Sequence, residues 1–378
     1  MKNKWNVSEL DKICEVEYGT RVVRKRDGGA KYPVYGGGGA TFFMDEPNRE
    51  NQLVIARFAM SEQCTRFVKG KFFLNDSGLT IKPKENIKIN QRFLDLQMIF
   101  LNNKIYSLGR GSAQRNLDMN AFRKIEISYP YSLEEQKAIV KILDEVFESI
   151  SKSKENAEKN LKNTKELFES YLEEVFLNPK EGWEEKKLGE IANVEYGFTG
   201  KAKSTGDFRY VRITDIDNDG LLIENNKLYL KKSKEAKKFI LNNEDLVMAR
   251  TGATYAKVLF YQDTEPSVFA SYLIRIKFNK NILNKLYWYF SKSRNYWNQA
   301  NSLSSGSAQP HFNGHALKEV VFNFPKEINQ QKIIVQKLDA LSKEIKELES
   351  IYKQKIKDLE ELKKSMLQKA FSGKLTKE

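Results

Sequence analysis

The sequence is poor in the residues that build metal sites and covalent frameworks. Among its 378 residues there are two cysteines, Cys14 and Cys64, and two histidines, His311 and His315, and no Cys-x-x-Cys pair occurs. A disulfide framework needs several paired cysteines, and a structural zinc site needs four Cys or His ligands. Both are therefore excluded, and we expect a reducing, cytoplasmic environment.

Long hydrophobic runs are missing as well. No stretch of about 18 uncharged apolar residues occurs, so the sequence predicts no transmembrane helix. The segment MKNKWNVSELDKI has no apolar core, so secretion is not expected. Apolar residues nevertheless make up 40% of the chain and aromatic residues 12%, which is enough for packed cores. At about 100–200 residues per domain, the length predicts two or three domains.

Motifs for catalysis and cofactor binding are also lacking. The glycine run after Tyr35 fits neither G-x-G-x-x-G nor G-x-x-x-x-G-K-[ST], so no nucleotide site is indicated. The eight prolines include no Pro-Pro pair, so the [NDS]-P-P-[YF] loop of nucleic-acid amino-methyltransferases is missing. His311 and His315 have no acidic third ligand beside them, and the Glu-x-Lys pairs follow no acidic residue on a strand. The sequence therefore predicts a binding protein with no catalytic residue, metal or cofactor of its own.

What the sequence does contain is an internal tandem duplication. The spaced Trp, Leu, Ile, Val-Glu-Tyr-Gly residues of 5–19 recur in 183–197, and Leu-Val-x-Ala-Arg at 53–57 recurs at 246–250. The tetrapeptide Gly-Ser-Ala-Gln occurs at 111–114 and again at 306–309. Because these matches keep one order, we infer two copies of one unit. The second copy is longer, and its additional residues precede the second tetrapeptide.

Each copy has a globular part followed by a long helix. Residues 1–130 and 179–328 are rich in aromatic residues, glycine and short alternating stretches, which predicts mixed α/β domains with many short strands. Residues 131–178 and 329–378 are dominated by Lys, Glu, Leu and Ile. Ser132 and Asn329 are candidate helix caps, while Asn178-Pro179 and Gly373 are stop signals. Each helix of about 45 residues would span roughly 65–70 Å.

The apolar residues of the two helices recur at spacings of four and three. The predicted seam consists of Ile139, Leu143, Val146, Ile150 and Leu167 in the first helix and Leu338, Leu341, Ile345, Leu348, Tyr352, Leu359 and Leu362 in the second. This period predicts a coiled coil. The two helices are most simply paired antiparallel with the globular parts at opposite ends, although each helix could instead pack on its own globular part. The polar middle of the first seam sets the register or leaves room for another protein.

The formal net charge of +14 is unevenly distributed. Residues 1–130 carry a net +8 and residues 179–328 a net +6, whereas the helical segments carry −4 and +4 and cancel. An amphipathic membrane-binding helix would carry its own excess of positive charge. Two basic globular parts joined by helices are instead typical of two nucleic-acid-binding domains, although such charge can also be ordinary solvated surface.

Particular basic segments are candidates for contact with DNA, because Arg and Lys bind phosphates and guanine edges and glycine permits close backbone approach. The basic segments of the two copies, given next, could instead be a flexible hairpin and an ordinary strand. In the first copy the candidates are Arg21, Arg24, Lys25, Arg26, Tyr35 and Gly37. In the second they are Thr199, Lys201, Lys203, Arg209 and Arg212.

These features together resemble one known family, the specificity (S) subunits of type I restriction-modification enzymes. The resemblance covers nearly the whole chain. It rests on the repeated tryptophan-to-glycine segment, Tyr32-Pro33-Val34-Tyr35-Gly36, the Leu-Val-x-Ala-Arg strands, both Gly-Ser-Ala-Gln tetrapeptides, the Gln136 and Gln331 helices and the ending Ser365–Leu375. One departure is Gln330, where the family more usually has the glutamate seen at Glu135.

The resemblance implies a fold and a function. Residues 1–130 and 179–328 would be target recognition domains, each binding one half of an asymmetric bipartite DNA site. The helices 131–178 and 329–378 would set the spacer between the half-sites and dock two modification (M) subunits. The M subunits would bring S-adenosylmethionine and methylate a flipped-out adenine in each half-site. Restriction (R) subunits would add ATP- and Mg-dependent translocation and cleavage, and this chain would bind no cofactor itself.

The duplication separates two classes of candidate residue. If the domains recognise different half-sites, residues shared by both copies are poor candidates for base discrimination. Shared residues are better interpreted as fold or phosphate-positioning residues: Arg57 and Arg250, Ser112 and Ser307, and Gln114 and Gln309. Base recognition is expected from residues that differ: Arg24, Lys25, Arg26, Tyr35, Arg110 and Arg115 against Thr199, Lys201, Lys203, Arg209, Arg212, Tyr255 and His311.

Two other interpretations remain open at this stage. The chain could be the recognition subunit of an enzyme that fuses methylation and cleavage, or a stand-alone homologue without an active complex. It could also be a coiled-coil scaffold whose globular parts bind protein. Loss of DNA affinity with rising salt would argue against the scaffold.

Overall fold

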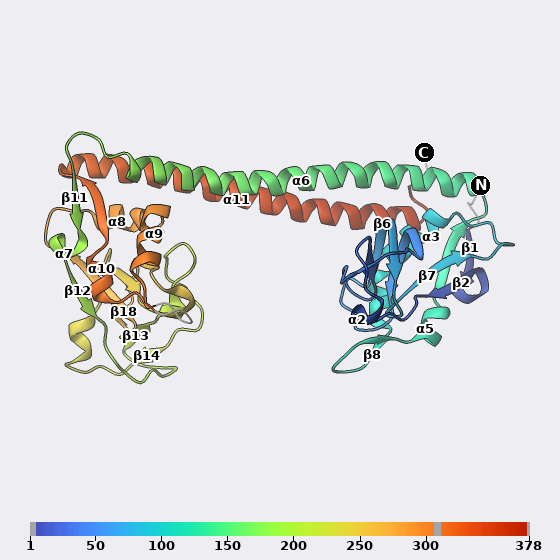
Figure 1. The fold of residues 1–378 in the computed structure, drawn as a ribbon, viewed down its shortest axis with the longest axis horizontal. Coiled ribbons are helices and arrows are strands. Elements are labelled where there is room, and N and C mark those ends of the chain that lie inside the picture. Colours follow the sequence, from blue (N-terminus) through green and yellow to red (C-terminus); the bar gives the residue numbers. More distant parts are fainter. Residues whose placement is uncertain (1–4, 306–310, 376–378) are drawn as a thin grey trace. The chain divides into compact units, whose positions relative to one another are not determined.

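The computed structural model describes residues 5–305 and 311–375 (Figure 1). The chain forms two compact units. The first comprises residues 1–158 and 354–378, and the second comprises residues 159–353. Each unit therefore contains one globular part and a section of both long helices.

The first unit is built on a six-stranded sheet with the order β2-β7-β5-β6-β3-β4. Its neighbours pair antiparallel except β3, which runs parallel to β6. The strands are β2 Cys14–Tyr18, β3 Tyr32–Tyr35, β4 Phe43–Met44, β5 Arg49–Ala56, β6 Thr65–Leu74 and β7 Gly78–Pro83.

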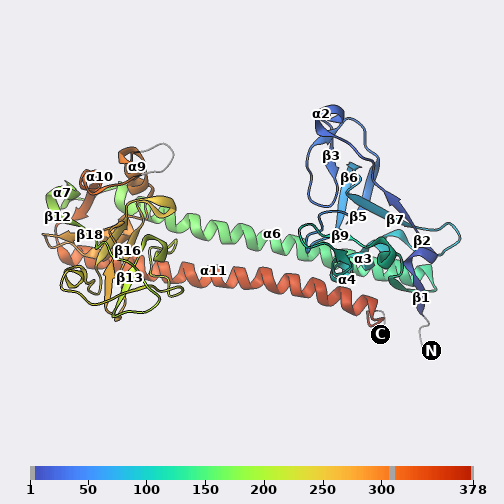
Figure 2. The same cartoon turned by 90° about the horizontal axis from the view of Figure 1, so that it is seen from below.

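Short helices and two small strand pairs complete this unit. β1 (Trp5–Glu9) pairs with β10 (Glu126–Pro130), and β8 (Gly109–Arg110) pairs with β9 (Asn116–Leu117). The helices are α1 Leu10–Ile13, α2 Arg24–Asp27, α3 Gln91–Phe100, α4 Asn102–Ser107 and α5 Met119–Arg123. α2 lies at the end of the unit opposite to the long helices (Figures 1 and 2).

The second unit contains two smaller sheets, with the orders β12-β18-β15-β16 and β14-β13-β17, and the pair β11-β19. The strands are β11 Trp183–Lys187, β12 Ala192–Tyr196, β13 Phe208–Val211, β14 Tyr229–Leu230, β15 Leu246–Ala249, β16 Val258–Phe260, β17 Ser267–Phe269, β18 Leu273–Phe278 and β19 Val321–Pro325. The α-helices are α7 Leu188–Ile191, α8 Asn284–Phe290, α9 Arg294–Leu303 and α10 Gly314–Lys318, and the 3-10 helices are Ile213–Asp215, Ala236–Phe239 and Gly252–Thr254.

The two long helices are α6 (Leu133–Leu177) and α11 (Ile328–Phe371), which confirms both predicted helical segments. Ser132 caps α6, since its hydroxyl accepts a hydrogen bond from Glu135 N at 3.3 Å. The prediction that Asn329 caps α11 is wrong, because the helix starts one residue earlier and the carbonyl of Glu327 accepts from Gln331 N. Gly373 follows α11 with a φ of +68°, where glycine is favoured.

In each unit the sections of α6 and α11 run antiparallel side by side (Figures 1 and 2). In the first unit Lys154 Nζ lies 2.7 Å from Glu360 Oε1, and Lys363 Nζ lies 5.0 Å from the ring centroid of Phe147. As the residue number increases along α6, the number of the contacting residue on α11 decreases, as antiparallel pairing requires. Each core also includes side chains of both helices, so neither helix packs only on its own globular part: Ile139, Leu143, Leu367 and Ala370 in the first unit, and Leu172, Phe176, Val335 and Leu338 in the second.

Most predicted seam residues are buried or half-buried. Ile139, Leu143, Ile150, Leu338 and Ile345 are buried, and Val146, Leu341, Tyr352 and Leu359 are half-buried. The prediction is wrong for Leu167, Leu348 and Leu362, which are 57%, 40% and 45% exposed. A helix with 3.6 residues per turn drifts by about 20° per heptad from a 3.5-residue pattern. The neighbours Phe168, Glu349 and Lys363 therefore face inward instead.

None of the described helices is long and apolar enough to span a membrane.

Candidate nucleic-acid interface

An arginine stacked on a tyrosine follows the same strand in both units. In the first unit Arg57 comes directly after β5, and its guanidinium carbon lies 4.7 Å from the ring centroid of Tyr18 and 4.6 Å from that of Phe58. In the second unit Arg250 follows β15 and lies 5.5 Å from Tyr196 and 5.2 Å from Tyr272. Stacking fixes the plane of a guanidinium while leaving its edge free to donate hydrogen bonds.

The backbone around these arginines is duplicated as well. Leu117 N donates to the carbonyl of Arg57, and Phe312 N donates to that of Arg250, each at 2.8 Å. The next residue in each copy, Asp118 or Asn313, caps the following short helix with its side-chain oxygen. The chain segment after each tetrapeptide thus returns to the repeated arginine.

Only the first tetrapeptide lies within the described residues. Gly111 has a φ of +110° and a Cβ there would come 2.3 Å from Gln114 O, so a tight glycine turn joins β8 to β9. Ser112 and Gln114 are exposed on this turn. Ser307 and Gln309 lie outside the described residues.

The basic segment at 21–26 forms an exposed surface around α2. Arg21, Arg24 and Lys25 are exposed and form no ion pair with any residue that the structure describes. Arg26 donates two hydrogen bonds to the carboxylate of Asp27, which lowers the pKa of Asp27. Three cations of this segment therefore remain available for phosphate oxygens.

The glycines that follow Tyr35 differ in their environment: some are closely packed and others are exposed. A Cβ on Gly37 would come 2.2 Å from Phe58 O, so this glycine is required by the fold rather than by a ligand. The ring of Tyr35 packs edge-on against Phe72 at 5.7 Å and is half-buried against a small core cluster. Gly38 and Gly39 face open space, and Arg66 donates to the carbonyl of Gly38.

The two arginines that flank the first tetrapeptide are tied to neighbouring side chains. Arg110 forms an ion pair with Asp118 yet stays 81% exposed. Arg115 lies over the ring of Tyr106 at 4.5 Å. Arg110 is therefore accessible near the turn that joins β8 to β9, whereas Arg115 is half-buried there.

In the second unit the predicted residues divide into two groups. Thr199, Lys201 and Lys203 are exposed, and the backbone of Lys203 forms a bridge with Tyr229 beside β14. Tyr255 donates a hydrogen bond to Asn301, and exposed His311 forms a backbone bridge with Thr251, next to Arg250. His311 therefore lies close to the stacked arginine, whereas the lysines lie along β14.

The prediction that Arg209 contacts DNA is wrong. Its side chain is 1% exposed, and its guanidinium lies 3.2 Å from Glu224 and 3.1 Å from Asp263. Strand β13 alternates between faces, and all four of its residues are buried, so a position that looks basic in sequence is internal. Arg212 is also held within the unit, because it forms an ion pair with Asp215 at 2.7 Å.

A lysine run in the second unit was missed by the sequence prediction. Five lysines between β14 and the end of the second 3-10 helix are exposed and form no ion pair in the described part of the chain: Lys231, Lys232, Lys234, Lys237 and Lys238. The run itself is visible in the sequence, but it has no counterpart in the first copy, so matching the two copies does not reveal it.

The comparisons with known proteins agree with this geometry. The sequence matches the family model described as "Type I restriction modification DNA specificity domain" over residues 2–162 and again over residues 180–358. The chain belongs to this family. It is a type I restriction-modification specificity subunit with two copies of the DNA specificity domain, as the resemblance predicted.

Two curated relatives are specificity subunits. The type I restriction enzyme StySPI specificity subunit of Salmonella potsdam is 24% identical over 316 residues, which cover 78% of this chain and 67% of the relative. The type I restriction enzyme EcoBI specificity subunit of Escherichia coli is 22% identical over 219 residues, which cover 57% of this chain and 44% of the relative. The match therefore spans about two thirds of the first relative and less than half of the second.

Two solved structures share the fold of this specificity subunit. A chain from work on complex assembly and conformational transition of the type I R-M system matches with a TM-score of 0.78 at 15% identity, covering 98% of each chain. The HsdS subunit from Thermoanaerobacter tengcongensis matches with a TM-score of 0.58 at 17% identity, covering 98% of this chain and 97% of that one. The predicted mixed α/β fold with two long helices is thereby confirmed.

The specificity subunit offers no evident metal centre in residues 5–305 and 311–375. No group of three His, Cys, Asp or Glu side chains in these ranges could hold a metal ion.

Proposed function

We propose that this specificity subunit recognises an asymmetric bipartite DNA site, with residues 1–130 and 179–328 each binding one half-site. The observation that supports this most is that the two units repeat one arginine–tyrosine contact but expose different cationic side chains. Both units carry an arginine stacked on a tyrosine after the equivalent strand. Elsewhere on their surfaces, the first unit exposes the arginines and lysine of α2, and the second exposes lysines beside β14.

Shared arginine contacts and different exposed side chains would suit two domains that bind the same DNA backbone but recognise different bases. Phosphate contacts orient a protein on the duplex without carrying sequence information, whereas base-edge contacts determine the sequence. Arg57 and Arg250 are shared and held by their tyrosines, so they would contact phosphates in the same way. Arg24, Lys25, Arg110 and Arg115 in one domain, and Thr199, Lys201, Lys203, Tyr255 and His311 in the other, would discriminate bases.

The helical segments 131–178 and 329–378 would set the spacer between the half-sites. Continuous helices of 45 and 44 residues are each roughly 65–70 Å long at 1.5 Å per residue. This length corresponds to about two turns of B-DNA at about 34 Å per turn. Changing the helix length would therefore change the number of unrecognised base pairs between the two half-sites.

Exposed apolar side chains of the same helices would dock the partner subunits. Leu167, Leu348 and Leu362 point away from the paired face and are at least 40% exposed. Covering them with a partner subunit would remove their apolar surface from water, which favours association. Two M subunits docked here would supply S-adenosylmethionine and methylate one adenine per half-site, and R subunits would add ATP- and Mg-dependent translocation and cleavage.

Methylome sequencing tests this proposal directly. Cells that express the chain with its M subunit should carry one bipartite methyladenine motif, because each domain selects one half. As a matched pair, substitutions confined to the α2 surface (Arg24 and Lys25 to Gln) should alter or relax one half of the motif. Substitutions at Lys201 and Lys203 should alter only the other half. A stably assembled complex that leaves no bipartite motif would contradict the proposal.

A further inference from the structure

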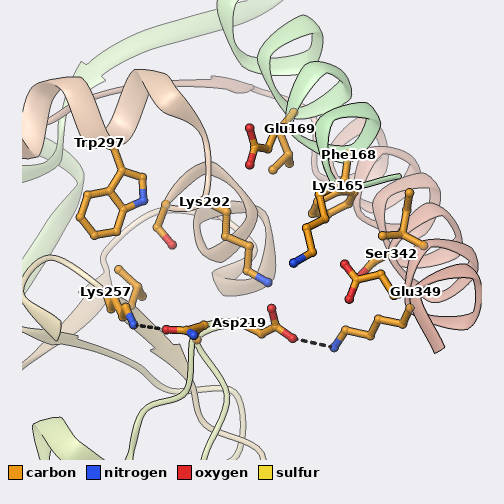
Figure 3. Close-up of a pocket in the computed structure, with 16 residues that line it drawn as sticks. Lys165, Phe168, Glu169, Asp219, Lys257, Lys292, Trp297, Ser342 and Glu349 are labelled. Atoms are coloured by element: carbon orange, nitrogen blue, oxygen red, sulfur yellow. Dashed lines mark hydrogen bonds and ion pairs between the residues drawn. The ribbon is translucent and has the colours of Figure 1, made fainter. Parts of the chain in front are cut away.

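A cavity of about 410 Å³ lies within the second unit (Figure 3). Its walls are α6 at 165–172, α11 at 342–349, the loop 218–220 and the segment between α8 and α9. This volume is typical of small-molecule sites. The loop belongs to the stretch in which the second copy is longer than the first.

The charged side chains of the cavity are four lysines and three carboxylates, and every carboxylate already has a cation. Asp219 lies 3.5 Å from Lys346. Glu169 lies 3.2 Å from Arg294, and Glu349 lies 3.1 Å from Lys353, and neither of these cations lines the cavity. Each acidic group is therefore paired with a cation other than the remaining three lysines.

Three lysines have no carboxylate within ion-pair distance among the described residues: Lys165, Lys257 and Lys292. Lys257 donates a hydrogen bond of 2.7 Å to the amide oxygen of Asn218, which carries no charge. Figure 3 shows the ammonium groups of Lys165 and Lys292 directed into the same space above Asp219. Like charges held together repel one another, and Asp219, which is also paired with Lys346, offsets only part of that repulsion. An anion between the lysines would relieve the rest.

Lys292 is the most constrained of the three. Its ammonium lies 3.4 Å from the ring centroid of Trp288 and 5.6 Å from that of Tyr289, which are cation–π contacts without a counter-charge. Burial lowers the pKa of Lys292 to about 8, and the positive charges of Lys346 and Lys285 contribute in the same direction. The carboxylates of Asp219 and Asp217 act in the opposite direction and raise this pKa. A bound anion would favour the charged lysine.

We propose that this cavity binds a small phosphate-bearing molecule. A phosphate group offers several acceptor oxygens and up to two negative charges, which matches converging lysines better than a single carboxylate does. The backbone of a duplex lies along a surface, whereas these lysines line a cavity between two helices and a loop, which better suits a small molecule. The indole of Trp297 forms a further wall, available to an aromatic group of the same ligand. This site is independent of the proposed DNA recognition.

The test is calorimetric titration of the full-length chain with inorganic pyrophosphate, followed in parallel by tryptophan fluorescence, since Trp297 lines the cavity. We expect saturable binding at one site. Lys165→Met and Lys292→Met should each weaken the affinity about 10- to 100-fold, as loss of a charged hydrogen bond does. Asp219→Asn should strengthen binding, because it removes a negative charge from the cavity wall.

Lys162→Met is the matched control. Lys162 is on the same helix, pairs with Glu166 and does not line the cavity, so its loss should leave the affinity unchanged. Absence of saturable binding to the unmodified chain, or equal weakening by Lys162→Met, would overturn the proposal. Pyrophosphate affinity that survives Lys165→Met and Lys292→Met, combined with weakened duplex binding, would also overturn it and assign these lysines to the DNA interface. The methylation motif tests DNA recognition separately.

Discussion

Gln136 on α6 and Gln331 on α11 make the same three hydrogen bonds, each in its own unit. Gln136 donates to the carbonyls of Lys88 and Pro130 and accepts from Asn90 N at 2.7 Å. Gln331 donates to Asn281 and Pro325 and accepts from Leu283 N at 2.9 Å. Both side chains are fully buried. Each glutamine thus joins the start of a long helix to the globular part before it.

Replacing either glutamine should destabilise its unit. Gln136→Met keeps the volume but removes the partner of the Asn90 amide and of the Lys88 and Pro130 carbonyls, and each such group costs about 1–3 kcal/mol where it is buried. We expect a loss of at least about 2 kcal/mol in the free energy of unfolding, measured by urea denaturation. Gln354→Met on the exposed face of α11 is the control and should change stability by less than about 0.5 kcal/mol. Equal effects of the two substitutions would contradict this role.

Arg57→Lys and Arg250→Lys should weaken DNA binding without changing the recognised sequence. Lysine keeps the positive charge but lacks the planar guanidinium that stacks on Tyr18 or Tyr196. We expect lower occupancy of methylated sites with an unchanged motif, measured by methylome sequencing at graded expression. A switched target sequence after either substitution would show that the shared arginines recognise bases.

The lysine run after β14 should dominate the salt dependence of DNA binding by the second unit. Every phosphate that the protein no longer neutralises reduces the slope of log K against log salt by about 0.9. Substituting Lys231, Lys232 and Lys234 by Gln should therefore reduce the slope by up to about 2.7, measured by fluorescence anisotropy. Gln substitutions at Lys353, Lys355 and Lys357 on α11 change the net charge equally and should leave the slope nearly unchanged. The reverse ranking would place the DNA on the helices.

Asp95→Asn should stabilise the first unit at neutral pH. Asp95 is 2% exposed, and burial raises its pKa to about 6, opposed by the hydrogen bond from Gln91. The folded pKa lies above the unfolded value of 3.8. The contribution of Asp95 to the free energy of unfolding therefore falls as the pH rises from about 4 to 6. The variant should gain up to about 3 kcal/mol above pH 6 and almost nothing at pH 4. Unfolding curves at pH 4, 5, 6 and 8 measure this, and a pH-independent difference would refute it.

Leu348→Glu should abolish docking of an M subunit while leaving the fold intact. Leu348 is 40% exposed on α11, so a carboxylate there stays hydrated. Co-purification with the M subunit and circular dichroism of the chain alone measure the two properties. Leu338→Glu is the contrasting variant, since Leu338 is fully buried and a charge there should unfold the second unit. Unchanged co-purification of Leu348→Glu would move the docking surface elsewhere.

Features that depend on local order along the chain could be predicted from the sequence. The duplication, the bounds of the two long helices and the concentration of positive charge in the globular parts are properties of residue order and composition. Helix periodicity and stop signals act within a few residues, so α6 and α11 were predicted almost to their ends. The family followed from motifs that recur in one order.

Only the tertiary structure shows which candidate side chains are exposed to a ligand or partner and which are buried. Arg209 looks like a surface cation in sequence but is buried between Glu224 and Asp263, which come from distant positions. The inward turn of Phe168 and Lys363 in place of Leu167 and Leu362 depends on the accumulated drift of paired helices. The cavity around Lys292 exists only because two helices and an inserted loop meet there. Sequence determined the repeated elements and their charge, because both are local; burial and pairing required the fold, because they join residues far apart in the chain.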